Sequence, residues 1–298
     1  MPTAPYMVFS GQIVQSADAR VHIDTPFCKY GVAVFEGLCG YRADDGTVNL
    51  FRLDDHLDRL VRSATLMRIP NVPDHSAMAA SIRSLLSANG HRNDVHIRVL
   101  LWLDGAGDLG SAEGSGWSVA TTDRPPSKPG LRVAISSWLR ADDRTAPPRI
   151  KAVSNYGAGR LALMQARQDG YDTALLLDRQ GHISEAPTSC AFFRIGGRMV
   201  TPRTTDSILE SVTRDTLLHL LAADGEAAEI RSIDRTEAYL AEEAFLCGSA
   251  VEIQPIFNID GFAIGSGAVG TRTQWLMARY ADLVRGRLSA PPGWLTTV

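Results

Sequence analysis

Lys151 and Glu185 are an amine and a carboxylate, two side-chain types that can take part in catalysis. Lys151 opens the run Lys-Ala-Val-Ser-Asn-Tyr, and Glu185 lies downstream in Gly-His-Ile-Ser-Glu-Ala-Pro-Thr-Ser. A lysine amine is nucleophilic only when neutral, and a carbonyl cofactor captures it as an imine. The same amine, once displaced, can carry a proton to and from a substrate carbon. Either residue could instead be a solvated surface group, which is the common situation of lysine and glutamate.

Short motifs around these two residues connect them to a known family. Lys151 with the Asn-Tyr pair at 155–156, the run Tyr-Asp-Thr-Ala-Leu-Leu-Leu-Asp at 171–178, and Ser-Glu at 184–185 resemble the class IV aminotransferases. The best-known members are the branched-chain amino acid aminotransferases, which use pyridoxal 5′-phosphate (PLP). The resemblance implies that Lys151 forms the Schiff base with PLP. It also implies that Glu185 keeps a proton on the pyridine nitrogen, so that the ring remains an effective electron sink.

Further motifs resemble the family's contacts with the rest of PLP. Tyr156 matches the tyrosine that hydrogen-bonds the phenolic oxygen, and Arg59, in Asp-His-Leu-Asp-Arg-Leu, matches the phosphate arginine. Outside this family context, they would read as a helix-start aromatic and a helix-surface arginine. The run Ile-Leu-Glu-Ser-Val-Thr-Arg-Asp at 208–215 resembles the helix start that holds the phosphate, where unpaired N–H groups and partial positive charge favour an anion. We expect Val212 and Thr213 to take this role.

A third segment, Cys-Gly-Ser-Ala-Val-Glu at 247–252, is similar to the family's Gly-Thr-Ala-Ala-Glu. The resemblance implies that the hydroxyl of Ser249 reaches the phosphate. It also implies that the amides of Ser249 and Ala250 face the substrate carboxylate.

The chain departs from the family pattern near these sites. Ser211 stands where glycine is usual. Ala186 follows the glutamate in place of glycine, and Cys190 stands where asparagine is usual. We therefore expect the carboxylate of Glu185 to be kept while its usual hydrogen-bonding neighbours are lost.

The substrate pocket matches the family less closely. Tyr30 and Phe35 belong to Tyr-Gly-Val-Ala-Val-Phe-Glu-Gly, which resembles the strand that lines the pocket for an aliphatic side chain. Cys39 stands where branched-chain enzymes commonly carry arginine. Arg98 could bind a distal carboxylate, as in 2-oxoglutarate, through two parallel hydrogen bonds, or serve as a structural ion-pair partner. His96 could be a polar pocket group or a half-exposed strand residue.

The elements that must position these residues read as an α/β (α+β) protein of two domains. Residues 123–130, Asp-Arg-Pro-Pro-Ser-Lys-Pro-Gly, give the strongest linker signal, because proline and glycine interrupt regular structure. We expect a small N-terminal α/β domain at 1–122, this linker, and a large PLP-binding domain at 131–298. The resemblance implies fold type IV, with a mixed, barrel-like sheet in the large domain. The linker is shorter than the aromatic-bearing loop of many branched-chain enzymes, which predicts a wider or differently shaped pocket.

Apolar periodicity and turn signals predict the elements in more detail. Helices are expected at 53–67, from about Val212 to Gly225, and around 276–283. Another is expected at about 78–86, with Asp74 as its N-cap and Gly90 as its stop. A further helix is expected after Tyr156, with Leu161 and Met164 facing inward. Strands are expected at 95–103, 117–121, 131–138, 173–178 and 182–185. A hairpin is expected to join 191–195 to 199–202 across the Gly-Gly pair at 196–197.

Composition restricts the classes of function. The chain has 298 residues, 45% of them hydrophobic and 21% charged, as in a soluble globular protein. Its net charge of −3 and lack of a basic block argue against a nucleic-acid partner. No apolar run approaches the ~20 residues that a membrane span requires, and the N-terminus lacks a secretory signal. The four cysteines show no zinc spacing, so we expect a cytoplasmic protein without a structural disulfide or metal.

The expected activity is a two-step amino transfer. A hydrophobic, branched-chain-like L-amino acid would give its nitrogen to PLP, and a 2-oxo acid such as 2-oxoglutarate would accept it. The alternatives are transamination of a D-amino acid or an (R)-amine, an aminodeoxychorismate-lyase-like reaction, and a non-catalytic PLP-binding protein. The resemblance also implies a homodimer in which the loop at 104–110 leans into the partner's site. The sequence itself shows only a glycine-rich loop there.

Overall fold

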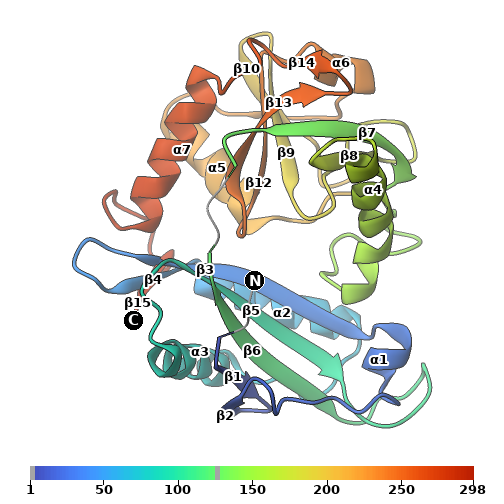
Figure 1. Ribbon diagram of the computed structural model, residues 1–298, viewed down its shortest axis with the longest axis vertical. Helices are drawn as coiled ribbons and strands as arrows, with labels where there is room; N and C mark the ends of the chain where they lie inside the picture. Colours follow the sequence, from blue (N-terminus) through green and yellow to red (C-terminus); the bar gives the residue numbers. More distant parts are fainter. Residues whose placement is uncertain (1–3, 125–127) are drawn as a thin grey trace. The chain divides into compact units, whose positions relative to one another are not determined.

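The computed structural model describes residues 4–124 and 128–298 (Figure 1). Contacts divide the chain into two compact units. The first comprises Met1–Pro125, Ile150–Ser154 and Asp282–Val298, and the second comprises Pro126–Arg149 and Asn155–Ala281. Lys151 therefore belongs to the first unit and Glu185 to the second. The expected boundaries at 1–122, 123–130 and 131–298 remain a prediction, and residues 125–127 of that linker lie outside the described residues.

The first unit is built on one antiparallel sheet of seven strands, in the order β15-β4-β3-β5-β6-β1-β2. The strands are β1 (Tyr6–Phe9), β2 (Gln12–Gln15), β3 (Ala33–Arg42), β4 (Val48–Phe51), β5 (Val95–Leu103), β6 (Ser115–Asp123) and β15 (Leu295–Thr297). The predicted strand at 95–103 is confirmed as β5, and the one at 117–121 lies within β6. The central pair β3–β5 runs in register from Ala33 opposite Trp102 to Gly40 opposite Val95.

Two helices cover one face of this sheet (Figure 1). Helix α2 (Leu53–Leu66) contacts β3 and buries Leu57 and Leu60, while α3 (His75–Asn89) contacts β1 and β6. Both predicted helices are confirmed. Asp74 caps α3 by accepting the amide of Ala77, and Gly90 ends it at a φ of 57°. A side-chain acceptor at the start and a left-handed glycine at the end satisfy backbone groups that the helix leaves unpaired.

The segment before β3 differs from the expectation. Tyr30 was expected on the strand with Phe35, and that placement is wrong, because Tyr30 is the last residue of the short helix α1 (Pro26–Tyr30). Thr25 caps this helix, Pro26 favours its first turn, and Gly31 ends it at a φ of 70°. The strand therefore begins only at Ala33, and the side chain of Tyr30 is exposed.

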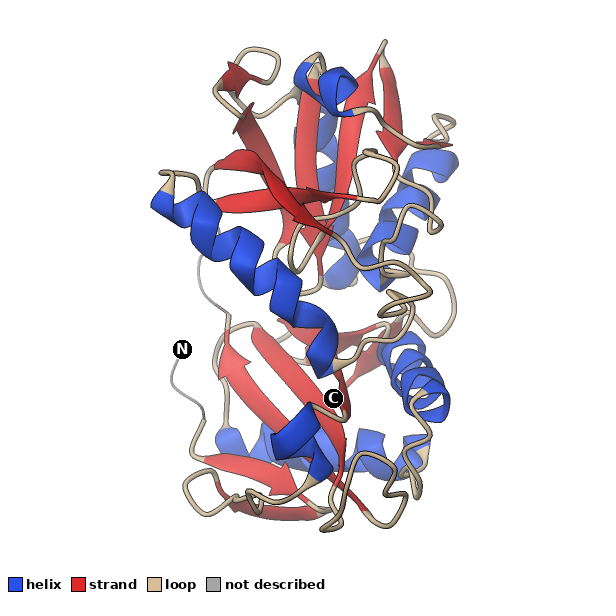
Figure 2. Cartoon of the chain, turned by 90° about the vertical axis from the view of Figure 1, so that its right-hand side faces the viewer, coloured by secondary structure: helices blue, strands red, loops and turns tan. Residues whose placement is uncertain are grey.

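The second unit is built on a curled mixed sheet of eight strands (Figure 2). Seven follow the order β11-β10-β9-β12-β13-β7-β8, and β14 pairs with β13. The strands are β7 (Leu131–Leu139), β8 (Thr173–Leu177), β9 (Cys190–Ile195), β10 (Arg198–Thr201), β11 (Glu229–Ile230), β12 (Glu243–Gly248), β13 (Glu252–Ile259) and β14 (Phe262–Ala263). The predicted β9–β10 hairpin is confirmed. Gly196 and Gly197 have positive φ of 58° and 77°, as a two-residue hairpin turn requires.

The predicted strand at 182–185 is wrong as a regular strand. Ile183 forms only an isolated bridge, with Leu177. The amide of Ile183 donates to the carbonyl of Ile233, whereas the next amide, that of Ser184, donates to Leu176. Leu176 accepts from the amide of Ser184 but donates to the carbonyl of Glu185, so two residues here oppose one on β8, and this extra residue interrupts the ladder.

The remaining helices are η1 (Val153–Tyr156), α4 (Gly157–Gln168), α5 (Val212–Ala223), α6 (Arg235–Tyr239) and α7 (Thr271–Val284). The expected inward direction of Leu161 and Met164 on α4 is wrong, since their side chains are 49% and 45% exposed. Small residues, Ala162 and Ala166, form the buried face, and they let the helix pack closely against β7 and β8. Among the described residues, no helix is both long and apolar enough to cross a membrane.

Candidate active-site residues in two units

Lys151 is held by its backbone from two sides. Its amide donates to the hydroxyl of Ser63 on α2 at 3.2 Å, and its carbonyl accepts from the amide of Phe35 on β3 at 3.1 Å. The next residue, Ala152, forms an isolated bridge with Val34. The lysine Nζ lies 4.8 Å from the centroid of the Phe35 ring. The main chain of Lys151 is therefore fixed on β3 and α2, and its amine lies over an aromatic ring.

Four predicted substrate residues share one face of the sheet next to this lysine. The register places Gly37 opposite Arg98 and Cys39 opposite His96. Directly opposed residues of antiparallel strands lie on one face, and alternate residues of a strand share that face. Phe35 therefore lies on the same face as these pairs, and the guanidinium carbon of Arg98 lies 4.3 Å from its ring centroid. The structure brings together Phe35, Cys39, His96 and Arg98, and their role in substrate binding remains a prediction.

His96 is a neutral group among cations. Burial lowers the pKa of His96 to about 4, and the charges of Arg98, Arg124 and Lys151 act in the same direction. The imidazole fits because its diagonal neighbour on β3 is glycine: a Cβ on Gly37 would lie 2.9 Å from His96 Nε2. At neutral pH the ring can accept or donate a hydrogen bond without carrying charge.

Arg59 lies in a buried charge network that the sequence did not reveal. Its Nε and Nη2 donate to the two oxygens of Glu36 at 2.5 and 2.7 Å, and His56 Nδ1 lies 2.7 Å from the same carboxylate. Burial alone would raise the pKa of Glu36, but Arg59 and His56 hold it well below its usual range. Burial lowers the pKa of His56. The phosphate role of Arg59 remains a prediction. His56 and Arg59 are three residues apart and therefore lie on one helix face, and this spacing is the sequence feature that could have indicated the network.

In the second unit, Glu185 is a buried carboxylate with several donors. Arg140, which follows β7, donates its Nε to Glu185 Oε1 at 2.8 Å, and its Nη2 lies 2.8 Å from the same oxygen. Arg140 Nη1 also donates to the carbonyl of Asn155 at 3.1 Å. The amide of Leu209 donates to Glu185 Oε2 at 3.1 Å, and Cys190 Sγ lies 3.6 Å from that oxygen. The expected loss of hydrogen-bonding neighbours is therefore wrong, because groups from other segments replace them.

The predicted phosphate helix begins where expected. Ser211 is the N-cap of α5, and its hydroxyl accepts the amide of Arg214 at 3.2 Å. Val212 and Thr213 form the buried first turn. Arg214 donates to the hydroxyl of Thr201 at 3.1 Å, so the start of α5 is fixed to the end of β10. A helix start of this kind presents amide dipoles to an anion.

The other predicted binding residues, Tyr156 and Ser249 for the cofactor and Ala250 for the substrate, lie at a helix junction and at a turn of the second unit. Tyr156 ends η1 and immediately precedes α4. Ser249 and Ala250 occupy the turn between β12 and β13, where Glu252 has a φ of 56°. Turns at strand ends commonly carry binding groups, because the strands fix them in place. The binding roles of these three residues remain predictions.

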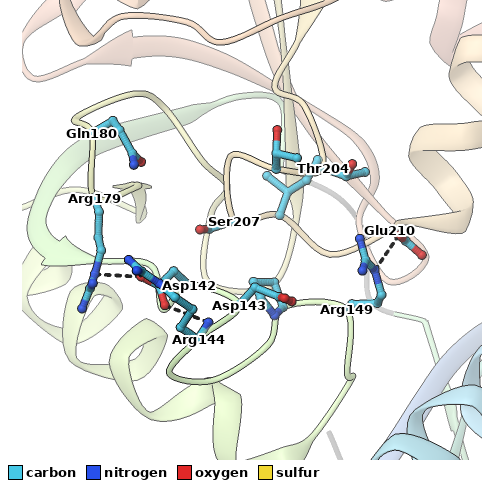
Figure 3. A pocket seen from close by; sticks show the side chains of 12 residues that line it. Asp142, Asp143, Arg144, Arg149, Arg179, Gln180, Thr204, Ser207 and Glu210 are labelled. Carbon is cyan, nitrogen blue, oxygen red and sulfur yellow. Dashed lines mark hydrogen bonds and ion pairs between the residues drawn. The ribbon is translucent and has the colours of Figure 1, made fainter.

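A cavity of about 300 Å³ lies in the second unit beside the loop that contacts Glu185 (Figure 3). Its wall includes Ile208 and Glu210, which flank Leu209. Charges on the wall pair with one another: Arg149 Nε lies 3.0 Å from Glu210 Oε1, and Arg179 Nε lies 2.8 Å from Asp142 Oδ2. Because these arginines and acids neutralise each other, the cavity favours neither an anion nor a cation.

One cluster in the second unit has metal-ligating side chains. Asp178, His182 and Asp206 place ligand atoms within 4.8 Å of one another. Asp178 Oδ1 accepts the amides of Gln180 and His182, both at 2.9 Å, and Asp206 accepts the hydroxyl of Ser232 at 3.0 Å. These bonds give Asp178 a structural role within its own turn, and Asp206 a structural role in joining two loops.

Comparisons with known proteins agree on one family. The family model of the class IV aminotransferases matches residues 33–259. The branched-chain-amino-acid aminotransferase of Escherichia coli K12 is 31% identical over 305 residues, covering 99% of this chain and 98% of that protein. The PLP form of the branched-chain amino acid aminotransferase from Thermobaculum terrenum is 36% identical with a TM-score of 0.93, covering 100% and 99% of the two chains. The T.th. branched-chain amino acid aminotransferase complexed with N-(5′-phosphopyridoxyl)-L-glutamate is 29% identical with a TM-score of 0.92, covering 98% of each chain.

Proposed function

Because the chain belongs to the class IV aminotransferases and is a PLP-dependent aminotransferase, we propose that Lys151 carries the cofactor and transfers the substrate proton. The observation that carries the proposal is the position of Lys151. The sequence has three lysines, and Lys128 is exposed in an ion pair with Asp172, while Lys29 donates to the carbonyl of Gly107. Lys151 alone of the three has its backbone bonded both to a strand and to a helix.

The residues present suit PLP chemically. When bound, PLP supplies a carbonyl for amine capture and a ring that withdraws electrons. Glu185 would hold the ring nitrogen, and Arg140 keeps that buried carboxylate paired. Val212 and Thr213 at the start of α5, with Ser249 and Arg59, would hold the phosphate, and Tyr156 the phenolic oxygen. Amide dipoles and an arginine suit a dianion.

The amine of Lys151 would move the proton at the substrate α-carbon. Its main chain is fixed, so the motion required for proton transfer is confined to the four-carbon side chain. A fixed main chain reduces the number of amine positions that must be searched, which is the benefit of orientation in catalysis. The ring of Phe35, whose centroid lies 4.8 Å from Nζ, limits the positions of the amine on one side.

Branched-chain amino acid transamination is the activity shared with the full-length relatives. We propose a branched-chain L-amino acid as donor and 2-oxoglutarate as acceptor. The complex of the T.th. relative with N-(5′-phosphopyridoxyl)-L-glutamate supports glutamate as one member of the pair. Arg98, exposed beside Phe35, has the guanidinium that a distal carboxylate requires, and Phe35 has the apolar surface that suits an aliphatic side chain.

A donor panel with matched lysine variants tests this function. The protein is incubated with PLP and 2-oxoglutarate, and glutamate formation is measured with L-leucine, L-valine, D-alanine or an (R)-amine as donor. L-Leucine and L-valine should be the best donors. Lys151→Ala should abolish turnover while remaining folded, and Lys128→Ala should keep it. Turnover that survives in Lys151→Ala would contradict the lysine assignment, and a preference for D-alanine or the (R)-amine would contradict the substrate assignment.

Two further properties are proposed on the same family basis. We propose a homodimer, with the loop at 104–110 reaching the partner's site, and a cytoplasmic location. Light scattering of the purified protein tests the first. Deleting part of the loop should lower turnover without changing the mass of the assembly if the loop serves the partner's site.

A further inference from the structure

Both oxygens of Glu185 are hydrogen-bonded by residues distant in sequence. Arg140 bonds Oε1, while the amide of Leu209 bonds Oε2 at 3.1 Å. The remaining neighbour is Cys190 at the start of β9, whose Sγ lies 3.6 Å from Oε2 and 3.6 Å from the carbonyl of Leu209. Cys190 therefore touches the carboxylate and the segment leading to α5 at the same time.

The thiol of Cys190 is a donor in this position. Its side chain is 3% exposed, and burial, followed by the charge of Glu185, raises its pKa to about 12. It therefore keeps its single hydrogen at any physiological pH. Of the two acceptors at equal distance, the carboxylate is the stronger, because hydrogen bonds to ionised groups are stronger than those to neutral ones.

The main chain that the thiol touches leads directly into α5. Leu209 lies two residues before Ser211, the N-cap, whose hydroxyl accepts the amide of Arg214 in the first turn of the helix. One buried sulfur thus connects the carboxylate of Glu185 with the main chain of Leu209, just before the N-cap of α5. An asparagine amide, the usual family residue here, has two N–H donors and a carbonyl, whereas the thiol is smaller and a weaker donor.

We propose that Cys190 is a positioning residue that joins Glu185 to the start of α5. The proposal rests on the proposed function, in which Glu185 holds the ring nitrogen of PLP and α5 holds its phosphate. Through Cys190 and Leu209, these two groups are held in one hydrogen-bonded unit. A displacement of the carboxylate is therefore transmitted to the residues that contact the phosphate.

A matched pair of cysteine variants tests this assignment. Cys247 is the control, because it is directly opposite Cys190 in the β9–β12 ladder and is completely buried. Cys190→Ala, Cys190→Ser and Cys247→Ala are compared with the unaltered holoenzyme. Cys190→Ser keeps the polarity with little change in volume, and its shorter C–O bond draws the donor away from Glu185.

Two readouts separate positioning from packing. The first is the dissociation constant of PLP, measured by absorption titration. The second is the ¹⁵N chemical shift of the ring nitrogen in bound, labelled PLP, which reports its protonation. Cys190→Ala should weaken PLP binding roughly fivefold to tenfold, the loss expected for one hydrogen bond of ordinary strength, because the thiol is a weak donor. It should also move the ring-nitrogen resonance, and Cys190→Ser should change both in the same direction by less.

The control determines the interpretation. Cys247→Ala should lower the thermal unfolding temperature by a similar amount, keep the PLP dissociation constant within about twofold and leave the resonance in place. Equal effects of Cys190→Ala and Cys247→Ala on both readouts would overturn the proposal, as would unchanged readouts in both Cys190 variants. If Cys190→Ala does not fold, Cys190→Ser decides by the same criteria. Failure of the unaltered protein to bind PLP would overturn the proposed function itself.

Discussion

Removing the cation beside Glu185 should destabilise the protein far more than removing a cation from its surface. Arg140→Met keeps much of the side-chain volume and deletes the guanidinium. In the unaltered protein the side chains of Arg140 and Glu185 are 11% and 6% exposed, and the closest approach is 2.8 Å. Breaking a buried pair by removing one partner leaves an uncompensated charge, which costs about 3–5 kcal/mol. The carbonyl of Asn155 also loses a donor.

Urea unfolding of the PLP-free protein measures this effect without a contribution from the cofactor. Arg198→Met is the matched control, because Arg198 forms an ion pair with Glu229 at 2.7 Å while its side chain is 73% exposed. A solvent-exposed pair contributes little to stability, so the control should change the free energy of unfolding only slightly. The free energy of unfolding should therefore fall several-fold more in Arg140→Met than in Arg198→Met.

A double variant identifies the cause. In Arg140→Met with Glu185→Gln, the unpaired charge is replaced by a neutral amide. The double variant should be more stable than Arg140→Met alone, because the deficit comes from the uncompensated carboxylate. The reasoning is refuted if Arg140→Met and Arg198→Met lose equal stability, or if Glu185→Gln makes Arg140→Met still less stable.

Three further results are expected. Ser63→Ala leaves the amide of Lys151 without its hydroxyl acceptor, so it should lower the free energy of unfolding by about 1–3 kcal/mol and change the absorption spectrum of bound PLP. Thr65→Ala, on the exposed side of the same helix, should do neither, and equal spectra of the two variants would contradict this prediction. His96 has a pKa of about 4 in the folded protein against 6.5 normally, so acid protonates the unfolded state first and favours it. This group should contribute at most about 3 kcal/mol to the stability lost between pH 6.5 and 4. Denaturant titrations at these two pH values should show a smaller loss of stability in His96→Asn than in the unaltered protein. Asp74→Ala removes the cap of α3 and should lower the urea midpoint of unfolding at pH 7. The difference in midpoint should be smaller in acid that protonates the carboxylate of the unaltered protein, and a difference that does not change with pH would contradict this prediction.

The sequence predicted those elements whose local signals agree with their packing. Helix α3 has a capping aspartate, a terminal glycine and an apolar face, and all three are used as expected. The face of α4 was predicted wrongly because Leu161 and Met164 suggested a large apolar stripe, whereas the neighbouring strands accept only small residues. Apolar spacing identifies a helix, but the distance to its neighbour decides which apolar side chains fit.

The sequence indicated which residue types belong to the candidate site, but it did not indicate which residues contact them. The motif around Lys151 predicted the lysine but contained no signal for Ser63, which is far away in sequence. Likewise, nothing next to Glu185 indicated that Arg140 and Leu209 would supply its donors. Long-range hydrogen bonds depend on how the strands and loops are brought together, and this information is spread over the whole chain.

The attachment of PLP to one lysine is the most direct test of the proposed chemistry. The holoenzyme is treated with borohydride, which makes a lysine-bound cofactor permanent, then digested and analysed by mass spectrometry. The chain offers three possible positions, Lys29, Lys128 and Lys151. We expect the added mass on the peptide that contains Lys151, and its loss when L-leucine is added before reduction. Attachment at Lys29 or Lys128, or no attachment, would contradict the account.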